Sequence, residues 1–269
     1  MFSEKEFKDI PPVTLIYMAV LGIMSLLSYT YENTDFLKLI KLDYKKVENK
    51  YEVWRLITTF FYIGKITPNL VFKFLLYYRR MKSNEKKFIK KKKLAEFIMM
   101  LIYLMIIIHI CNYIGYYYFK IKINSFLSHQ LMFSIILINS KREPNKLFRF
   151  YFVKIENRYV PIFLYIFRSL RNKNKMISHT ISFIPGIAYY WLKDIAPAQG
   201  ILQDILVTPK FLVDFIENNF YKKMKKKKKI IKSNSNNGQN NENTNNINKE
   251  NNNISENAKE KNSNNSNIH

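Results

Sequence analysis

The stretch of sequence that decides the fold is residues 54–64, W-R-L-I-T-T-F-F-Y-I-G, where a Trp-Arg pair opens an apolar run. An arginine at the centre of a bilayer costs at least ~2.5 kcal/mol, so Arg55 is expected at the edge of the hydrocarbon. Tryptophan is enriched at the membrane–water interface, which suits Trp54. We predict that the pair anchors the place where the next helix enters the bilayer. The alternative is an ordinary interfacial aromatic residue beside a cation that extends into water.

The composition divides the chain into a long apolar part and a polar tail. The chain has 269 residues, a formal charge of +24 and 48% hydrophobic residues. From about residue 233 to residue 269 it consists mostly of Asn, Ser, Lys and Glu. Such a segment cannot bury enough apolar surface to fold, so the tail is predicted to be disordered. We expect a membrane domain at residues 1–215 and a basic, then Asn-rich, cytosolic tail at residues 216–269.

The metal-binding and redox classes are excluded by the cysteines and histidines. Cys111 is the only cysteine, so neither an intrachain disulfide nor a CxxC metal site can form. The histidines lack H-E-x-x-H spacing, which argues against zinc catalysis. His109, inside an apolar run, is expected to be a hydrogen-bonded packing residue. No metal and no cofactor are therefore predicted.

The spacing of the charges argues for a membrane and against nucleic acid. Lys and Arg cluster between apolar runs, which is typical of the cytoplasmic side of a membrane protein. Residues 1–11 are polar and include three acidic residues, so no cleavable signal peptide is predicted and the first apolar run is expected to be retained. A transporter or channel would be expected to show inverted repeats or ion sites at the midplane, and the sequence shows neither.

Six apolar runs are candidates for membrane spans. They lie at residues 13–31, 55–78, 94–119, 125–139, 159–170 and 176–192. Gly64 and Pro68 interrupt the second run, which predicts a kinked or late-starting helix there. Residues 31–53 are of mixed character and are predicted to form an amphipathic segment on the membrane surface.

The basic residues predict the orientation of these spans. Residues 79–93, 140–158 and 222–229 are strongly basic, and residues 79–93, which carry nine Lys or Arg, are expected to be exposed. These segments alternate as required for six spans with both termini in the cytosol. Residues 168–175 are the exception, because this topology places their basic side chains on the side of the membrane opposite to the cytosol.

Several motifs, taken in their order and spacing, resemble those of the Derlin family, the rhomboid-like pseudoproteases of the endoplasmic reticulum membrane. The resemblance covers about residues 10–208. Its motifs are I-P-P-V-T at 10–14, E-V-W-R-L-I-T at 52–58, L-Y-Y-R at 76–79, S-K-R-E-P at 140–144, and Gly186, Tyr189, Tyr190, Leu192, Asp194 and Pro197 in the last run.

The resemblance implies an all-α, polytopic membrane protein with a six-helix rhomboid-like fold in the endoplasmic reticulum membrane. It implies a role in endoplasmic-reticulum-associated degradation, in which misfolded proteins pass to the cytosol through a locally thinned bilayer and a lateral gate. The implied partners are misfolded proteins, a membrane-bound ubiquitin ligase, a cytosolic AAA ATPase and the lipid bilayer, with homo- or hetero-oligomers left open. Short, interrupted spans agree with thinning, because a bilayer thins around helices that are too short for it.

Two departures from the family pattern bear on these implications. The family's sixth helix carries G-x-x-x-G, which lets helix backbones approach closely, whereas this chain has Ser182 and Gly186 with Pro185 between them. Close packing remains possible, and a kink at the proline is expected. The tail has only Asn-Gly-Gln at 237–239 in place of the family's Gly-rich ATPase-binding motif, so direct binding of the ATPase is in doubt.

The protease positions distinguish a pseudoprotease from an enzyme. Active rhomboids use a serine in G-x-S-x on the fourth helix and a histidine on the sixth. His179 stands seven residues before Gly186 and matches the histidine, but Gln130 occupies the nucleophile position in S-H-Q-L. A glutamine cannot form an acyl-enzyme, and Ser128 and Ser134 lie off the motif. We predict that the protein is not an enzyme, with an active rhomboid-type intramembrane serine protease as the alternative.

A lysine run follows the last apolar run and has two interpretations. It consists of Lys225, Lys226, Lys227, Lys228 and Lys229. The simpler interpretation is a solvated topology signal. The functional one is attachment to anionic lipid, which contributes about 1 kcal/mol for each basic residue near the surface.

Overall fold

The structure is a computed structural model that describes residues 10–31, 36–120, 124–150, 153–171, 180–201, 203 and 205–222. The chain separates into two compact units, Met1–Pro209 and Lys210–His269. In the second unit, helix α13 (Lys210–Ile216) is followed by the π-helical turn η4 (Glu217–Tyr221). The predicted disordered tail and the lysine run at 225–229 lie outside the described residues.

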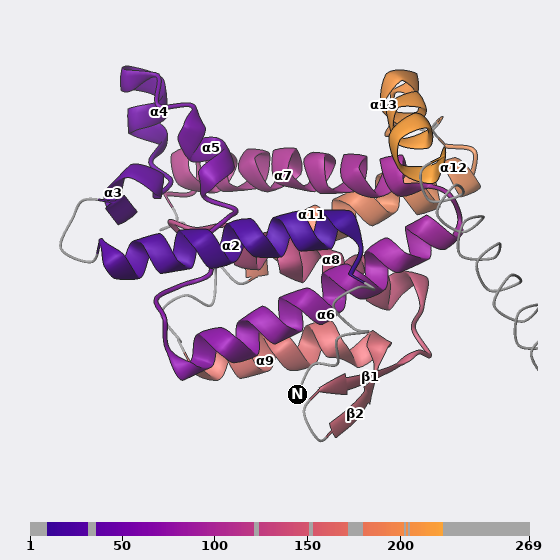
Figure 1. Cartoon of the computed structure of the whole chain (residues 1–269), viewed down its shortest axis with the longest axis horizontal. Coiled ribbons are helices and arrows are strands. Elements are labelled where there is room, and N and C mark those ends of the chain that lie inside the picture. Colours follow the sequence, from indigo (N-terminus) through magenta and orange to yellow (C-terminus); the bar gives the residue numbers. More distant parts are fainter. Residues whose placement is uncertain are drawn as a thin grey trace, which may run out of the picture. The chain divides into compact units, whose positions relative to one another are not determined.

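The first unit is built from helices at the six predicted apolar runs (Figure 1). These helices are α2 (Pro12–Thr30), α6 (Pro68–Lys90), α7 (Leu94–Tyr117), α8 (Ser128–Arg142), α9 (Val160–Arg171) and α11 (Phe183–Tyr190), the last extended by η3 (Trp191–Ile195) and α12 (Ala196–Ala198). Within the described residues, the only sheet is a hairpin of β1 (Leu147–Phe150) and β2 (Val153–Glu156), which pair antiparallel with Leu147 opposite Glu156. The prediction of an all-helical fold is confirmed.

Successive long helices run in alternating directions between two ends of the first unit. The backbone N–H groups of Val13 and Thr14, where α2 begins, donate to the Glu85 carboxylate near the end of α6 at 2.8 and 2.6 Å. Arg142, at the end of α8, pairs with Asp194 just after α11. The bundle therefore starts and ends on the side that carries the β1–β2 hairpin, which we call the hairpin end. Three short helices, α3 (Phe36–Ile40), α4 (Tyr44–Lys50) and α5 (Trp54–Thr58), occupy the opposite end (Figure 1).

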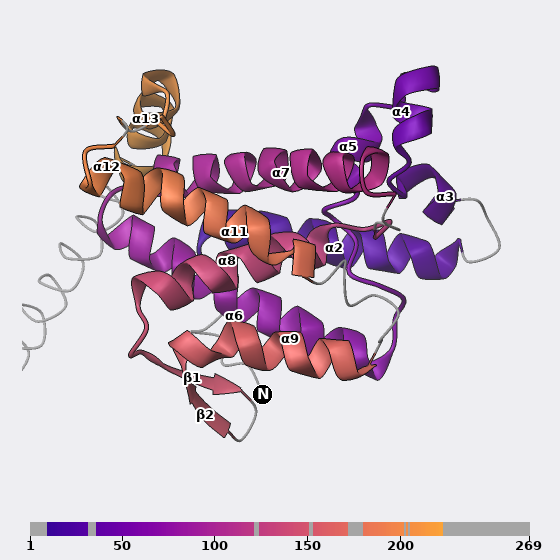
Figure 2. The same cartoon turned by 180° about the vertical axis from the view of Figure 1, so that it is seen from behind.

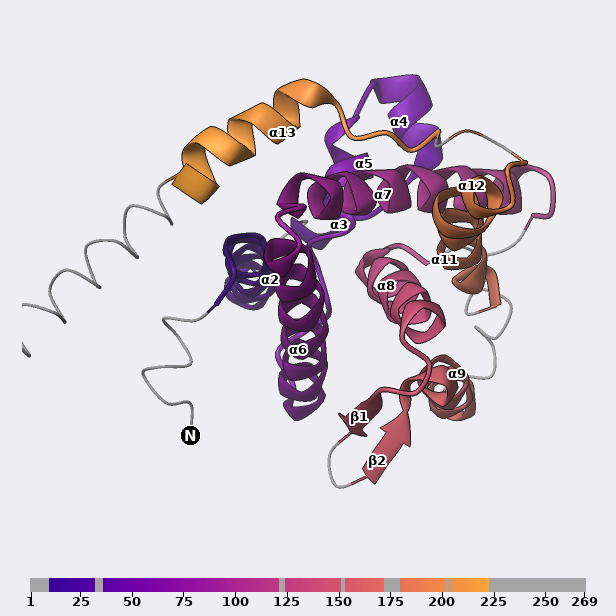
Figure 3. The same ribbon diagram turned by 90° about the vertical axis from the view of Figure 1, so that its right-hand side faces the viewer.

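Helix α8 is the central element of the first unit. Figure 3 shows it surrounded by α6, α7, α9 and α11, and Figure 2 shows α11 alongside it. Eleven of its 15 residues are buried, including the polar Ser128, Gln130, Ser134, Asn139 and Ser140. Helix α2 also buries polar residues, Thr14, Ser25 and Ser28, beside the apolar Tyr17, Met18 and Leu21, and it exposes Leu15, Ile16, Ile23 and Leu26. Apolar side chains on the outside of a helix bundle are what a lipid environment favours.

Among the described residues, two helices, α2 and α7, are long and apolar enough, by length and composition, to cross a membrane. Helices α8 and α9 are shorter, at 15 and 12 residues. Length and composition therefore identify some of the spans directly, while the others are recognised by their place in the bundle.

The second apolar run forms a late-starting helix. Residues 54–58 fold as the separate helix α5, and α6 begins only at Pro68. Gly64 lies between them with φ of +150°, which side chains rarely permit. Pro68 occupies the first turn of α6, where its missing N–H has no helical partner to lose. Of the two predicted alternatives, the late start is the one that the structure adopts, and the span does not begin at Arg55.

The prediction that residues 79–93 form an exposed segment is wrong. Helix α6 continues through it to Lys90, and Arg80, Met81, Asn84 and Glu85 are all buried. The helix persists because its polar residues find partners inside the protein, as Glu85 does on the first turn of α2. A buried polar group is tolerated when it is hydrogen-bonded.

The sixth helix is interrupted where the small-residue motif lies. Ser182 is in a turn and α11 starts at Phe183. Pro185 therefore falls in the first turn of α11, where a proline costs no interior hydrogen bond. The last turns widen into the π-helical η3.

Candidate functional site

The Arg55 side chain of the Trp-Arg pair lies inside the protein. It is 2% exposed, its Nη1 donates to the carbonyls of Lys38 and Lys41 at 2.5 and 2.8 Å, and its Nε pairs with the Glu52 carboxylate. The neighbouring Trp54 is 51% exposed. A cation that extends into water would need an exposed guanidinium, so this geometry does not fit that alternative, and the anchoring of a membrane span stays a prediction. The element that Arg55 ties down is α5 together with residues 38–41, and not the span α6.

His109 supports the same end of the bundle from α7. One of its ring nitrogens, Nε2, lies 2.8 Å from the carbonyl oxygen of Leu56, and its ring packs edge-on against Phe60. Tyr44 also approaches His109, with its hydroxyl donating to the His109 carbonyl at 3.2 Å. The prediction that His109 is a hydrogen-bonded packing residue is confirmed.

The polar groups of α8 that the resemblance compares with protease positions are hydrogen-bonded within the bundle. The Ser128 hydroxyl donates to the Tyr62 carbonyl at 2.6 Å, and the Ser134 hydroxyl donates to the Gln130 carbonyl at 2.9 Å. The Gln130 side chain exchanges two hydrogen bonds with Asn112 on α7. All three α8 side chains are at most 1% exposed. His179 lies outside the described residues, so its relation to Gln130 stays a prediction.

Gly186 brings α11 directly against α8. A Cβ atom added at Gly186 would lie 2.9 Å from Leu137 Cδ2 and 3.1 Å from both the Cα and the carbonyl oxygen of Ser134. The last two are backbone atoms, so they cannot move aside as a flexible side chain can. Ser182, one turn earlier, is also buried. The small residues therefore lie where two backbones approach closely, which is how such motifs work in membrane helices.

A bidentate ion pair joins the end of α8 to η3, which continues α11. Arg142 Nε donates to both oxygens of Asp194 at 3.1 Å, and Arg142 Nη2 donates to Oδ2 at 2.8 Å. The guanidinium also lies 5.9 Å from the ring centre of Tyr189. An arginine–carboxylate fork fixes direction as well as distance, so α8 and η3 are held in one register.

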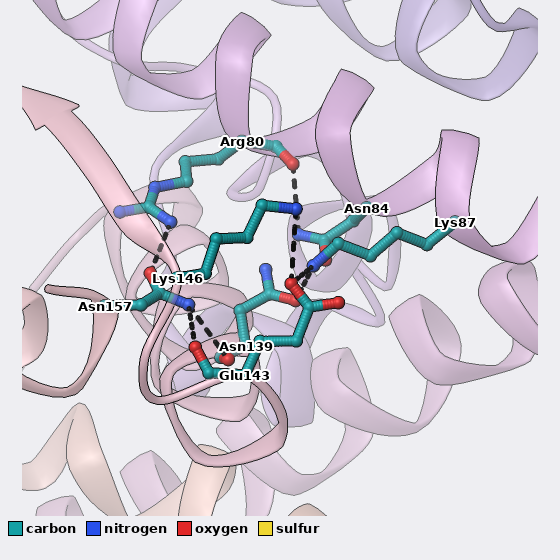
Figure 4. Close-up of polar contacts among 7 residues, drawn as sticks. All are labelled: Arg80, Asn84, Lys87, Asn139, Glu143, Lys146 and Asn157. Atoms are coloured by element: carbon teal, nitrogen blue, oxygen red, sulfur yellow. Dashed lines mark hydrogen bonds and ion pairs between the residues drawn. The ribbon is translucent and has the colours of Figure 1, made fainter.

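A partly buried polar cluster at the hairpin end was not anticipated from the sequence (Figure 4). We call it the hairpin-end cluster; it consists of Arg80, Asn84, Lys87, Asn139, Glu143, Lys146 and Asn157. Asn157 connects the other members. Its side-chain oxygen accepts from Arg80 Nη1 at 3.0 Å, and its side-chain nitrogen donates to the carbonyls of Asn139 and Glu143 at 3.0 and 3.2 Å. Glu143 pairs with Lys87 at 2.9 Å and with Lys146 at 3.3 Å.

Glu143 is the one carboxylate among the seven residues of this cluster, and its lysine partners shift its pKa. Partial burial acts to raise the pKa of Glu143, but the hydrogen bond and charge of Lys87, together with Lys146, outweigh it and lower the pKa below its ordinary value. A sequence signal for the cluster did exist. Arg80, Asn84 and Lys87 are spaced i, i+4 and i+7, which places them on one face of a helix.

The fold and these contacts together define a class. A bundle of alternating helices that exposes apolar side chains, and in which two of the described helices are long and apolar enough to cross a membrane, fits a polytopic membrane protein. The model of one family, the Der1-like family, matches residues 10–210. The chain belongs to the Der1-like family.

Curated relatives agree with this assignment over most of the chain. It is 26% identical over 215 residues to the probable derlin-1 homolog of Dictyostelium discoideum, a match that covers 77% of this chain and 82% of the relative. It is 27% identical over 215 residues to the probable derlin-2 homolog of the same organism, covering 80% and 83%. Derlin-2.1 of Zea mays is 27% identical over 214 residues, covering 78% and 84%.

Proposed function

We infer that this protein is a Der1-like component of endoplasmic-reticulum-associated degradation, which helps misfolded proteins to leave the lumen or membrane for the cytosol without cutting them. One observation carries the proposal. In a chain of the Der1-like family, Gln130 at the rhomboid nucleophile position is held in a reciprocal hydrogen-bonded pair with Asn112.

The absence of proteolysis is argued from the chemistry of α8. A serine nucleophile needs a base within hydrogen-bond reach, but the hydroxyls of Ser128 and Ser134 both donate to backbone carbonyls. A hydroxyl donating to a carbonyl is not activated for attack. The Gln130 amide has no nucleophilic role.

The orientation in the endoplasmic reticulum membrane is proposed from charge. The basic segments 79–93 and 140–158 contribute to the hairpin end, where the six-helix bundle both starts and finishes. Positive charge collects on the cytosolic side of membrane proteins. The hairpin end and both termini are therefore assigned to the cytosol, and α3–α5 to the lumen.

The lengths of two central helices support local thinning of the bilayer. Helix α8 has 15 residues, or about 22 Å at 1.5 Å per residue. Helix α9 has 12 residues, or about 18 Å. Both are shorter than a hydrocarbon layer of about 30 Å, and a bilayer responds to such mismatch by thinning. A thinner layer lowers the cost of passing polar chain segments.

The partners are proposed by family membership and by charge. They are misfolded proteins, a membrane-bound ubiquitin ligase and, through other subunits, a cytosolic AAA ATPase. Lys225, Lys226, Lys227, Lys228 and Lys229 would attach the tail to anionic lipid on the cytosolic face. In this proposal Trp54 and Arg55 order the lumenal segment, and Ser182 and Gly186 hold α11 against α8.

Pulse-chase labelling of a misfolded lumenal protein tests the proposed function. Cells depleted of this protein should degrade the client several times more slowly than wild-type cells, and re-expression should restore the rate. An unchanged half-life of several such clients on depletion would contradict the proposal.

An active intramembrane protease is the second candidate, because His179 has the spacing of the rhomboid histidine relative to Gly186. The two functions differ in their response to substitution. A protease would lose cleavage of a helical substrate in Ser128→Ala or His179→Ala, whereas the proposed function predicts no cleavage by wild-type protein.

A further inference from the structure

The Arg80 guanidinium in the hairpin-end cluster has only part of its hydrogen-bonding capacity used. Nη1 donates to Asn157 at 3.0 Å, and the flat face of the group stacks on Phe148 at 3.4 Å from the ring centre. Nε and Nη2 are buried and have no hydrogen-bond partner among the residues that the structure describes. The whole residue is 6% exposed. Unpaired donors of a buried cation are costly, so this arrangement requires an explanation.

The unpaired atoms have a geometry that selects their partner. Nε and Nη2 lie on one edge of the guanidinium, and their parallel N–H groups form the fork that receives two oxygens of one carboxylate or phosphate. The contact to Asn157 uses the opposite corner of the guanidinium (Figure 4), and the contact to Phe148 uses its face. The fork is therefore fixed in orientation before any ligand arrives.

The charges of the cluster also favour an anion. Among the seven residues drawn in Figure 4, three are cationic (Arg80, Lys87 and Lys146) and one is a carboxylate, Glu143, which leaves an excess of two positive charges. Glu143 is already engaged with both lysines. An uncompensated charge in a partly dry site attracts a counter-charge from outside.

The position of Arg80 indicates which anion reaches it. It follows directly after the mostly apolar residues 70–78 of α6, so we expect it where a bilayer changes from hydrocarbon to headgroups. Phe148, on the two-stranded hairpin, covers the face of the Arg80 guanidinium, and a two-stranded sheet is only marginally stable by itself. We propose that the Arg80 fork binds the phosphate group of an anionic phospholipid, with the β1–β2 hairpin shifting to admit it.

A titration of the full-length protein in detergent tests this assignment. The probe is dihexanoyl phosphatidic acid, and the readout is the rise of the thermal unfolding midpoint, since a ligand of the folded state stabilises it. Arg79→Met is the matched control, because it removes the exposed arginine next in the chain. Wild-type protein and Arg79→Met should show the same saturable rise. In Arg80→Met the apparent affinity should fall about ten- to a hundredfold, the loss expected for a charge-assisted fork.

Two further arms separate the alternatives. Arg80→Lys keeps the charge but not the fork, so it should also bind the lipid more weakly than wild type. Wild-type affinity in Arg80→Lys would overturn the fork assignment. If Arg80→Met does not fold, the affinity of Arg80→Lys is the test of the fork. Equal affinity in Arg80→Met and Arg79→Met would overturn the site itself. A rise with inorganic phosphate equal to that with the lipid would overturn the lipid assignment. This readout is independent of client degradation.

Discussion

Asn112 on α7 and Gln130 on α8 bind each other through both halves of their amides. Asn112 Nδ2 donates to Gln130 Oε1 at 2.6 Å, and Gln130 Nε2 donates to Asn112 Oδ1 at 3.2 Å. Both side chains are 1% exposed. The pair is closed, because each amide supplies the donor that the other's acceptor needs. Gln130 is therefore explained by packing between two central helices.

Replacing one member of the Asn112–Gln130 pair should lower stability more, for each residue replaced, than replacing both members together. Asn112→Leu and Gln130→Met each leave the remaining amide unsatisfied, so each should lower the free energy of unfolding by about 1–3 kcal/mol. The double variant should be more stable than the sum of the single losses predicts, by roughly 0.5–1.5 kcal/mol. Denaturation in detergent measures all four proteins, and strictly additive losses would show that the two side chains are not coupled.

The close approach at Gly186 should not tolerate a methyl group. Gly186→Ala places a carbon about 3 Å from the backbone of Ser134, and such overpacking costs about 1–3 kcal/mol. Gly22→Ala is the matched control, because no atom lies within 4 Å of an added Cβ in α2. That substitution should be neutral or stabilising by up to about 1 kcal/mol. Equal effects of the two substitutions on thermal stability would argue against tight α8–α11 packing.

Arg55 should matter for folding as much as for membrane contact. Arg55→Met removes the donor for two carbonyls and leaves Glu52 without its ion pair. Breaking a buried pair from one side costs about 3–5 kcal/mol. Arg79→Met, which removes an exposed arginine, should leave stability within about 0.5 kcal/mol of wild type. Protease sensitivity of residues 36–58 provides the measurement, and unchanged protection in Arg55→Met would contradict the assigned role.

Stability of the hairpin end should fall in acid through Glu143. Its pKa is lower in the folded protein than its ordinary value, so its stabilising contribution is present at neutral pH and is lost as pH falls through the folded pKa. Between about pH 6 and about pH 3, which brackets an ordinary glutamate pKa, wild-type protein should lose more thermal stability than Glu143→Gln. Parallel pH profiles for the two proteins would show that the carboxylate is not linked to folding.

The helices were predictable because long apolar runs favour helices, and α2 and α7 also have the length and composition of membrane spans. The basic segment 79–93 misled the prediction because charge counts do not show which face of a helix is covered. Two of its buried residues have partners far away in the chain: Arg80 donates to Asn157, 77 positions away, and Glu85 accepts from Thr14, 71 positions away.

The contacts of the candidate site residues could be predicted from the sequence only in part. The exclusion of Gln130 as a nucleophile follows from its chemistry alone, but its partner Asn112 is 18 residues away on another helix. Arg55 was placed at a boundary by its cost in lipid, whereas its acceptors are carbonyls of Lys38 and Lys41, which no side-chain pattern identifies.

The size of a misfolded client trapped on its way out tests the central claim most directly. With the proteasome inhibited, cells that express this protein should accumulate the client in the cytosol at full length, and depletion should keep it in the lumen. A shortened client fragment that appears with wild-type protein and disappears in Ser128→Ala or His179→Ala would contradict the account, because it would show that the protein cuts what it is proposed only to move.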